Sequence, residues 1–259
     1  MADSAGVQSA DNLRRRVSRF LSSRAYERSR VSALIDTLAR NGPVAIFGGM
    51  IRDLSFGGSR AFWSDVDLVV SGSLPGDLGY ELKRFKPRHN SFGGYRLDLG
   101  RWRADVWCLA DTWAFHHGHL ALTGLNALPG TAFFNWDAVA YDAASGKLFC
   151  RPDYLENIQN RILDINFEPN PKPLKMVVRT LRFMLSRQAR LAPSLARYVH
   201  LHLRDVEANE IAALEKSGNQ PSMLDTAIVR RIAEQLRAHV ETNSPAAFEL
   251  ESEQLNISF

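Results

Sequence analysis

The stretch that decides the fold runs from Val44 to Val70 and reads VAIFGGMIRDLSFGGSRAFWSDVDLVV. Its first four residues, Val44 to Phe47, are an apolar run that ends in glycine, which predicts a buried strand. Gly48 and Gly49 would let the backbone approach a ligand closely, because neither carries a Cβ. From Met50 the chain can turn helical, and the free N–H groups at a helix N-terminus favour phosphate.

Two carboxylates follow on an alternating segment, Ser64 to Val70. Side chains on a strand alternate between its faces, so we expect Asp65 and Asp67 to point the same way. Two carboxylates held side by side repel each other unless a cation lies between them. Mg²⁺ prefers oxygen ligands and usually takes one or two carboxylates plus substrate phosphates. A two-ion site places its metals about 3.5–4 Å apart. The pattern therefore predicts a magnesium site.

Such a site usually takes a third carboxylate from a neighbouring strand. Asp105 is the candidate, because it lies in the strand-like run Arg103 to Leu109. Asp98 also alternates with apolar neighbours, but its segment is less apolar and fits the expected order less well. A lone Asp-x-Asp is more often a solvated strand end. Here the pattern leads directly into Leu-Val-Val and follows a Gly-Gly-x-x-Arg helix start, which favours the metal site.

Length and composition indicate a globular protein. The chain has 259 residues, 45% of them hydrophobic, which is enough for one large or two small domains. No run of eighteen apolar residues occurs, so no membrane span is expected. The N-terminus lacks the basic and apolar regions of a signal peptide. Cys108 and Cys150 are the only cysteines, and a buried thiol at Cys108 is favoured over a disulfide. These features indicate a cytoplasmic protein.

The charge is unevenly distributed. Between Arg151 and Arg204 there are ten Lys or Arg residues against four acids, and from Asp205 onward acids predominate. A basic segment beside a metal site suits a polyanionic partner, because Lys and Arg displace counterions from phosphates. An ordinary solvated helix surface is the alternative. The acidic C-terminal region could bind a protein partner.

Periodicity and punctuation give the remaining elements. Amphipathic helices are expected at 12–22 and 27–40, and helices again from Pro171, over 193–202 and twice within 205–240. A loop around Pro75 and a short helix from Tyr80 to Phe85 precede a hairpin at Gly93 and Gly94. The resulting divisions are 1–42 (N-terminal helices), 43–150 (head), 151–241 (helical neck or remnant body) and 242–259 (a flexible or partner-bound tail).

Three histidines lie close together at His116, His117 and His119. A zinc site usually needs separated ligands with Cys or His partners elsewhere, and no such partner stands out. We therefore expect a polar loop.

Several motifs in a fixed order resemble a known family. Gly48-Gly49-Met-Ile-Arg52-Asp53 and then Asp65-Val-Asp67 are similar to the head of the polymerase-β-like nucleotidyltransferases, specifically bacterial CCA-adding tRNA nucleotidyltransferases and poly(A) polymerases. The resemblance runs from about Pro43 to about Leu191. Further matching segments are Asp137 to Asp142, Ser145 to Phe149, Tyr154 to Leu163 and Val178 to Phe183.

The resemblance implies an α+β fold with a small mixed β-sheet head, flanking helices and an all-α neck. It implies that Gly48, Gly49 and Arg52 contact the triphosphate of an incoming nucleotide. Asp65 and Asp67 would hold two Mg²⁺ ions, with Mn²⁺ as an alternative metal. Asp105 would complete the catalytic and metal-binding acids and orient the acceptor hydroxyl. Further nucleotide contacts would come from the neck residues Lys175, Arg179 and Arg182. For Arg182 a structural ion pair is an equal alternative.

Three departures from the family pattern affect the choice of base. The segment Thr131 to Trp136 has no basic residue where the family linker is arginine-rich, and Asp137 replaces an asparagine. The neck template of an acid pair followed by Arg reads Lys172-Pro-Leu-Lys-Met176 here. Lysine cannot accept a hydrogen bond from a base amino group, and replacing Arg by Lys loses the planar fork.

The function that the resemblance implies is transfer of NMP from an NTP to an RNA 3′-hydroxyl, with release of pyrophosphate. A tRNA acceptor end is the first candidate, bound along the basic neck. The alternative is NMP transfer to a protein hydroxyl or to another nucleotide as a signal, in a toxin or phage-defence system. A non-catalytic, antitoxin-like binding protein is the third hypothesis.

Overall fold

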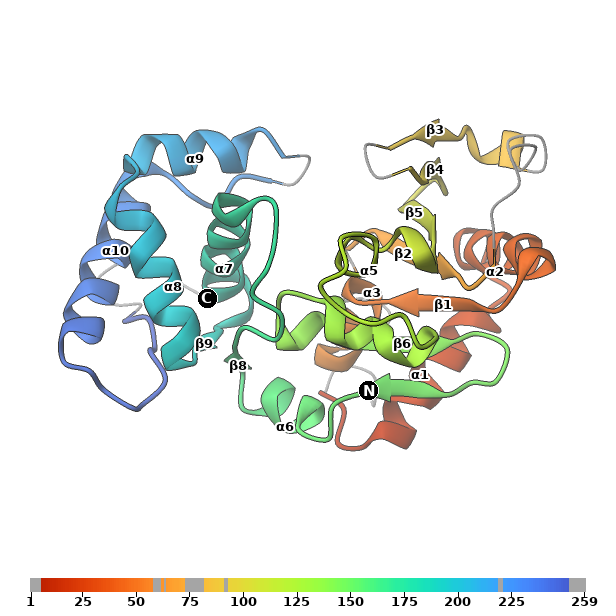
Figure 1. Cartoon of the computed structure of the whole chain (residues 1–259), viewed down its shortest axis with the longest axis horizontal. Helices are drawn as coiled ribbons and strands as arrows, with labels where there is room; N and C mark the ends of the chain where they lie inside the picture. Colours follow the sequence, from red (N-terminus) through yellow and green to blue (C-terminus); the bar gives the residue numbers. More distant parts are fainter. Residues whose placement is uncertain are drawn as a thin grey trace. The chain divides into compact units, whose positions relative to one another are not determined.

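The computed structural model describes residues 6–57, 62, 64–72, 82–90, 93–218 and 221–251 (Figure 1). The chain divides into two compact units, Met1–Gln159 and Asn160–Phe259. The expected loop around Pro75 and the start of the helix expected from Tyr80 lie outside the described residues. The described end of that helix is a single 3-10 turn, Lys83–Phe85.

The first unit is built on a seven-stranded sheet with the order β3-β4-β5-β2-β1-β6-β7. Strands β2 and β5 pair in parallel, and the other neighbours pair antiparallel, so the sheet is mixed as expected. The strands are β1 (Val44–Phe47), β2 (Val66–Val70), β3 (Arg88–His89), β4 (Tyr95–Asp98), β5 (Arg103–Cys108), β6 (Val139–Asp142) and β7 (Leu148–Cys150).

Helices surround this sheet (Figure 1). Those described in the first unit are α1 (Ala10–Leu21), α2 (Tyr26–Leu38), α3 (Gly49–Phe56), α5 (Trp113–His116) and α6 (Tyr154–Gln159). Helix α1 begins where the Ser9 side chain accepts a hydrogen bond from the Asn12 amide, an N-cap that satisfies one free backbone donor. Its predicted apolar stripe is buried at Leu13, Val17 and Phe20. This confirms the amphipathic helix expected there.

One side of the sheet carries a core cluster. Ala45, Val69 and Ala140 pack there with Leu125, which begins a 3-10 segment (Leu125–Thr131). Val69 lies two residues after Asp67, so the aspartate and this cluster share one side of β2. The apolar part of β2 is therefore covered, and the acidic part lies next to it.

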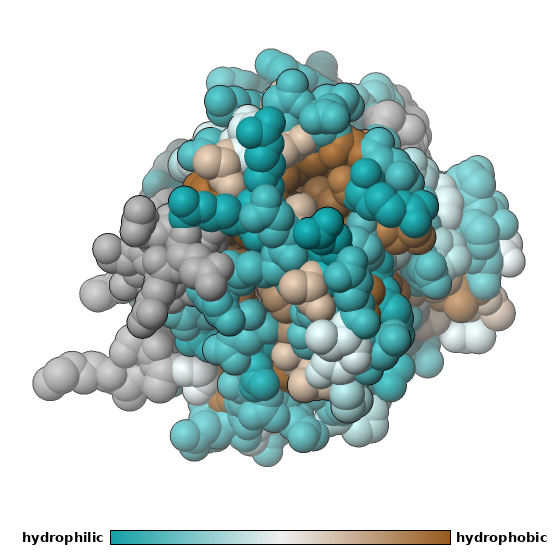
Figure 2. Space-filling view, turned by 90° about the vertical axis from the view of Figure 1, so that its left-hand side faces the viewer, coloured by the Kyte–Doolittle hydropathy of each residue, from teal (hydrophilic) through white to brown (hydrophobic). Residues whose placement is uncertain are grey.

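The second unit is helical, with α7 (Pro173–Arg187), α8 (Pro193–Arg204), α9 (Ala208–Lys216) and α10 (Thr226–Glu241). Proline opens both α7 and α8, where its missing N–H costs nothing. The expectation of an all-α neck needs one correction, because Ile162–Leu163 (β8) pairs in parallel with Arg190–Leu191 (β9). The face in Figure 2 is largely hydrophilic, with hydrophobic residues visible only in gaps between polar ones.

The first part of the expected flexible tail is fastened to the second unit. Phe248 is buried and exchanges two backbone hydrogen bonds of 2.8 Å with Leu191. This differs from the fraying expected from residue 242, because an aromatic side chain gains more from burial than the short segment loses in entropy. Both cysteines are free thiols, as favoured by the sequence.

A buried ion pair ties α7 to α9. Arg182 donates to the carboxylate of Glu215, which is only 4% exposed, and to the carbonyl of Pro221 at 2.9 Å. Glu215 also accepts from Ser222 and from the amide of Met223. Burial alone would raise the pKa of Glu215, but these hydrogen bonds and Arg182 together lower it. The network holds the segment between α9 and α10.

We expect Glu215→Gln to lower the free energy of unfolding by about 3 kcal/mol at neutral pH, because it removes the buried carboxylate that neutralises Arg182. Since folding lowers the pKa of Glu215, its contribution is full above the ordinary value of 4.5 and is lost as the pH falls below it. Urea unfolding at a series of pH values from about 6 to about 3 should show that the difference in free energy of unfolding between wild type and variant becomes smaller as the pH falls. Glu210→Gln, on the exposed side of α9, is the control, and an equal loss in both variants would contradict the assignment.

Candidate active site

Strand pairing brings the three predicted acids together. Asp67 on β2 lies directly opposite Asp105 on β5 in the parallel register. Asp65 comes one residue before β2, which begins at Val66 and not at Ser64 as expected. All three carboxylates are half-buried. The register therefore places Asp67 and Asp105 side by side on two adjacent strands, with Asp65 two residues before Asp67.

The glycine pair emerges beside these acids. Strand β1 runs antiparallel to β2 and its last residue, Phe47, pairs with Asp67, so Gly48 follows at the acidic end. Gly48 has a φ of 64°, a left-handed value that favours glycine. A Cβ on Gly49 would lie 3.0 Å from the Cβ of Ser64. The turn thus lies against the residue that precedes Asp65, and α3 begins there.

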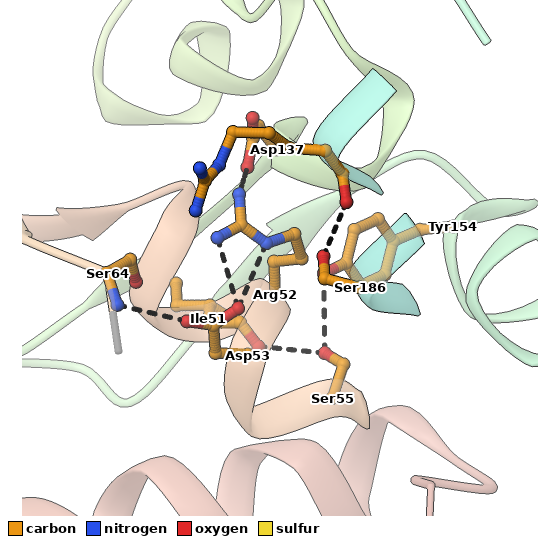
Figure 3. Close-up of polar contacts among 9 residues, drawn as sticks. Ile51, Arg52, Asp53, Ser55, Ser64, Asp137, Tyr154 and Ser186 are labelled. Carbon is orange, nitrogen blue, oxygen red and sulfur yellow. Dashed lines mark hydrogen bonds and ion pairs between the residues drawn. The ribbon is translucent and has the colours of Figure 1, made fainter. Parts of the chain in front are cut away.

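Arg52 is buried in a double ion pair. Its guanidinium donates to Asp53 at 3.0 and 3.1 Å and to Asp137 at 2.5 Å (Figure 3). Burial alone would lower the pKa of Arg52, but the two carboxylates raise it. Asp137, which replaces the family asparagine, is therefore the second carboxylate of this pair. Contact between Arg52 and a triphosphate stays a prediction.

Asp53 connects the ion pair of Arg52 to the segment that precedes β2. Its other carboxylate oxygen accepts a hydrogen bond of 3.1 Å from the backbone amide of Ser64 (Figure 3). Arg52 orients Asp53, Asp53 fixes Ser64, and Ser64 immediately precedes Asp65. Sequence reasoning missed this positioning role for Asp53, although its place beside Arg52 in the glycine motif could have suggested it.

Asp105 is held by an arginine that the sequence analysis did not consider. Arg96 on β4 lies directly opposite Asp105 and donates to both of its carboxylate oxygens, at 2.9 and 2.6 Å. The Arg96 side chain is 44% exposed. Arg96 and Asp98 are two residues apart, so the sequence pattern places both on the polar face of the strand. The pattern does not identify Asp105 as the partner of Arg96, because that follows only from the pairing of β4 with β5.

The acids remain electrostatically strained. Burial raises the pKa of Asp65, and the charge of Asp105 raises it further, while Arg103 and Arg96 oppose the change. Within the described residues no three His, Cys, Asp or Glu side chains converge on one metal position. Asp65 and Asp67 nevertheless supply the hard oxygen donors that Mg²⁺ prefers. The donor set fits that metal, with Asp105 available once Arg96 releases it.

The other predicted contacts lie in the second unit. Lys175 and Arg179 are exposed and stand four residues apart on α7, which places them on one side of the helix. The structural alternative for Arg182 is present as its ion pair with Glu215. Its nucleotide contact, like those of Lys175 and Arg179, stays a prediction.

Two further segments have structural explanations. Where the family linker is basic, Phe134 and Trp136 are fully buried, so this segment belongs to the core.

The histidine segment is partly helical and not simply a loop, because α5 ends at His116. The rings of His117 and His119 lie 5.1 and 4.8 Å from the ring of Trp113.

Solved structures share this architecture. The chain resembles a CCA-adding enzyme in complex with CTP, at 17% identity and a TM-score of 0.61, over 89% of this chain and 55% of that one. It also resembles a CCA-adding enzyme with ATP (20%, TM-score 0.56, 84% and 53%). A third is a tRNA nucleotidyltransferase complexed with a primer tRNA and an incoming ATP analog (18%, TM-score 0.53, 85% and 63%).

These similarities confirm the α+β fold that the motifs predict. In particular, the chain has the fold of the head and neck of CCA-adding enzymes. It spans 53–63% of the length of those three structures. No protein-family model matches the sequence, and neither does any curated protein. Among the described residues no helix has the length and apolar composition that a membrane span requires.

We expect Arg52→Met to lower the free energy of unfolding by about 3–5 kcal/mol, because it removes the buried guanidinium that neutralises both Asp53 and Asp137. Adding Asp137→Asn to this variant should recover part of the loss. Arg14→Met is the control, since its ion pair with Asp11 is exposed and should be worth no more than about 1 kcal/mol. Equal losses in urea unfolding for the two single variants would show that Arg52 does not organise the site.

Proposed function

We propose that this protein is a metal-dependent nucleotidyltransferase that moves NMP from an NTP to an RNA 3′-hydroxyl and releases pyrophosphate. A tRNA acceptor end is the first candidate substrate. The observation that carries the proposal is the register pairing of Asp67 with Asp105, with Asp65 alongside and the Gly48–Gly49 turn next to them. The shared fold with enzymes solved with CTP, ATP or a primer tRNA supports it.

Each part of the site has a chemical task in this proposal. Asp65 and Asp67 hold divalent metal, which would neutralise the charge that develops on phosphate during transfer. Gly48 and Gly49 bring backbone close to the triphosphate at the start of α3, where N–H groups are unsatisfied. Asp105 orients the acceptor hydroxyl. Catalysis of this kind relies mainly on positioning and charge neutralisation, so a rigid frame around the acids is its main requirement.

The buried ion pair of Arg52 supplies that rigidity. Its side chain is 7% exposed, and those of Asp53 and Asp137 are 3% and 11% exposed. Through Asp53 it holds the Ser64 amide. In the proposed enzyme Arg52 is therefore a positioning residue for Asp65.

A second candidate is transfer of NMP to a protein hydroxyl or to another nucleotide. It is favoured by the start of α7, where Lys172-Pro-Leu-Lys-Met176 stands in place of the family template of an acid pair followed by Arg. Lysine offers only donors, so this segment cannot read a base amino group. Label moving from NTP into protein or a small molecule, with RNA absent, would select this candidate.

Asp67→Asn should reduce transfer of radiolabel from NTP to bulk tRNA roughly a hundred-fold or more, because losing a metal ligand removes several kcal/mol of transition-state stabilisation. Each of the four NTPs is assayed separately with Mg²⁺ and with Mn²⁺. Asp98→Asn is the matched control, since Asp98 is an exposed carboxylate on β4, two strands away from Asp67 in the same sheet. Wild-type protein that labels no RNA with any NTP would rule out the proposed function.

Arg96→Gln should tighten Mn²⁺ binding about 3–10-fold, because it removes a partly exposed, bidentate competitor from Asp105. Isothermal titration of Mn²⁺ without nucleotide measures this directly. Lys147→Gln, in the turn before β7 at the opposite edge of the sheet, should leave the affinity unchanged. An unchanged affinity in Arg96→Gln would mean that the metal does not compete with Arg96 for Asp105.

A further inference from the structure

One row of cross-strand partners runs from the edge of the sheet to the acids. Arg88 on β3 lies opposite Arg96 on β4, Arg96 lies opposite Asp105 on β5, and Asp105 lies opposite Asp67 on β2. Directly opposed residues share one face of a sheet. The acidic site therefore continues, strand by strand, into a row of arginines that ends at edge strand β3 (Figure 1).

Arg103 adds a third cation to this face. It lies two residues before Asp105 on β5, so both side chains point to the same side. Arg103 is exposed and close enough to Asp65 for its charge to oppose the rise in the pKa of that carboxyl. We call Arg88, Arg96 and Arg103 the arginine edge.

The arginine edge has an electrostatic cost that the described chain does not fully relieve. Arg88 and Arg96 are like charges in directly opposed positions, which destabilises a strand pair. Asp105 neutralises Arg96. Asp98 lies directly opposite Arg103, but within the described residues neither Arg88 nor Arg103 makes an ion pair, and both are exposed. Such an arrangement favours an anionic partner at the edge of the sheet.

The position of the edge indicates which anion it would bind. The strand order places the acids of β5 and β2 between the glycine turn after β1 and the arginines of β4 and β3. In the proposed reaction the glycine turn takes the triphosphate. A second phosphate-bearing substrate would then approach the acids from the opposite side, and arginine forks match phosphate geometry.

We propose that the arginine edge binds backbone phosphates of the acceptor RNA strand and so directs its 3′-hydroxyl to the acids. This inference rests on the proposed function and adds a contact surface on the head to the basic neck. Neighbouring strands lie about 4.8 Å apart, so side chains as long as arginine can reach consecutive phosphates from β3, β4 and β5. When metal occupies Asp105, Arg96 is free to join Arg88 and Arg103 in this task.

The test is fluorescence anisotropy of a labelled single-stranded RNA of mixed sequence, with full-length protein across a range of salt concentrations. Arg88→Gln combined with Arg103→Gln should weaken binding about ten-fold or more at low salt. The slope of log affinity against log salt should become shallower by about 1.4, or about 0.7 for each lost phosphate contact. Each single variant should account for about half of this change.

Lys147→Gln is the control, because Lys147 is an exposed cation at the opposite edge of the same sheet. It should leave the slope unchanged. The melting temperature of Arg88→Gln should be equal to that of wild type or higher, since the variant removes a like-charge pair. Binding of an NTP with Mn²⁺ should also be unchanged in Arg88→Gln, because Arg88 lies two strands away from Asp105.

The outcomes separate this inference from the proposed function. If wild type extends RNA but the double variant binds RNA with the same affinity and salt slope, the arginine edge is refuted and the proposed function stands. If wild type transfers NMP only to protein or to a nucleotide and binds no RNA, both are refuted. A shallower slope in Arg88→Gln and in the double variant, with NTP binding intact in Arg88→Gln, supports the arginine edge.

Discussion

Repulsion between the paired carboxylates of Asp67 and Asp105 is the constraint on which the rest of the site depends. Their strands are adjacent and in register, so the backbone separates the two residues by only about 5 Å. Like charges in directly opposed positions are unfavourable. Relief comes through cations that other strands supply: Arg96 bonds to Asp105, and Arg103 stands near Asp65. A divalent metal ion would offset the same repulsion, because it carries two positive charges on one small ion, whereas a guanidinium carries one.

The ion pairs of Arg52 and of Arg96 differ in burial, and that difference assigns their roles. Arg52 and its partners Asp53 and Asp137 have side chains that are 3–11% exposed, whereas Arg96 is 44% exposed. Breaking the ion pairs of Arg52 would leave charged side chains in the protein interior, which solvates charge poorly. Opening the Arg96 contact costs little, because water can solvate the released guanidinium. The buried ion pairs of Arg52 are therefore suited to hold the site permanently. The exposed pair is suited to a change of partner, in which Arg96 releases Asp105.

Local pattern was sufficient to predict β1 from its apolar run and the start of α8 at Pro193, and it placed the start of α7 at Pro171, two residues before the observed Pro173. It could not reveal the partner of Arg52, because Asp137 lies 85 residues away. The same holds for Glu215, which lies 33 residues from Arg182, and for Phe248 in the expected tail. Periodicity reports which face of an element is apolar. It does not report which charged side chain of another element lies against that face. A charged residue can therefore be predicted as a ligand contact when it forms an ion pair within the folded protein, as Arg182 does with Glu215.

In the proposed enzyme the same distinction would separate the chemistry of transfer from the choice of base. The acids that would hold metal, the glycine turn and their frame all lie in the first unit and depend on sheet register. The start of α7 in the second unit offers Lys172, Lys175 and, one turn on, Arg179, which are all donors. Donors suit phosphate oxygens, and the amino groups of cytosine and adenine need acceptors. A site with this composition can keep strong phosphate chemistry while lacking a side-chain template for the base, so any base preference must come from other groups.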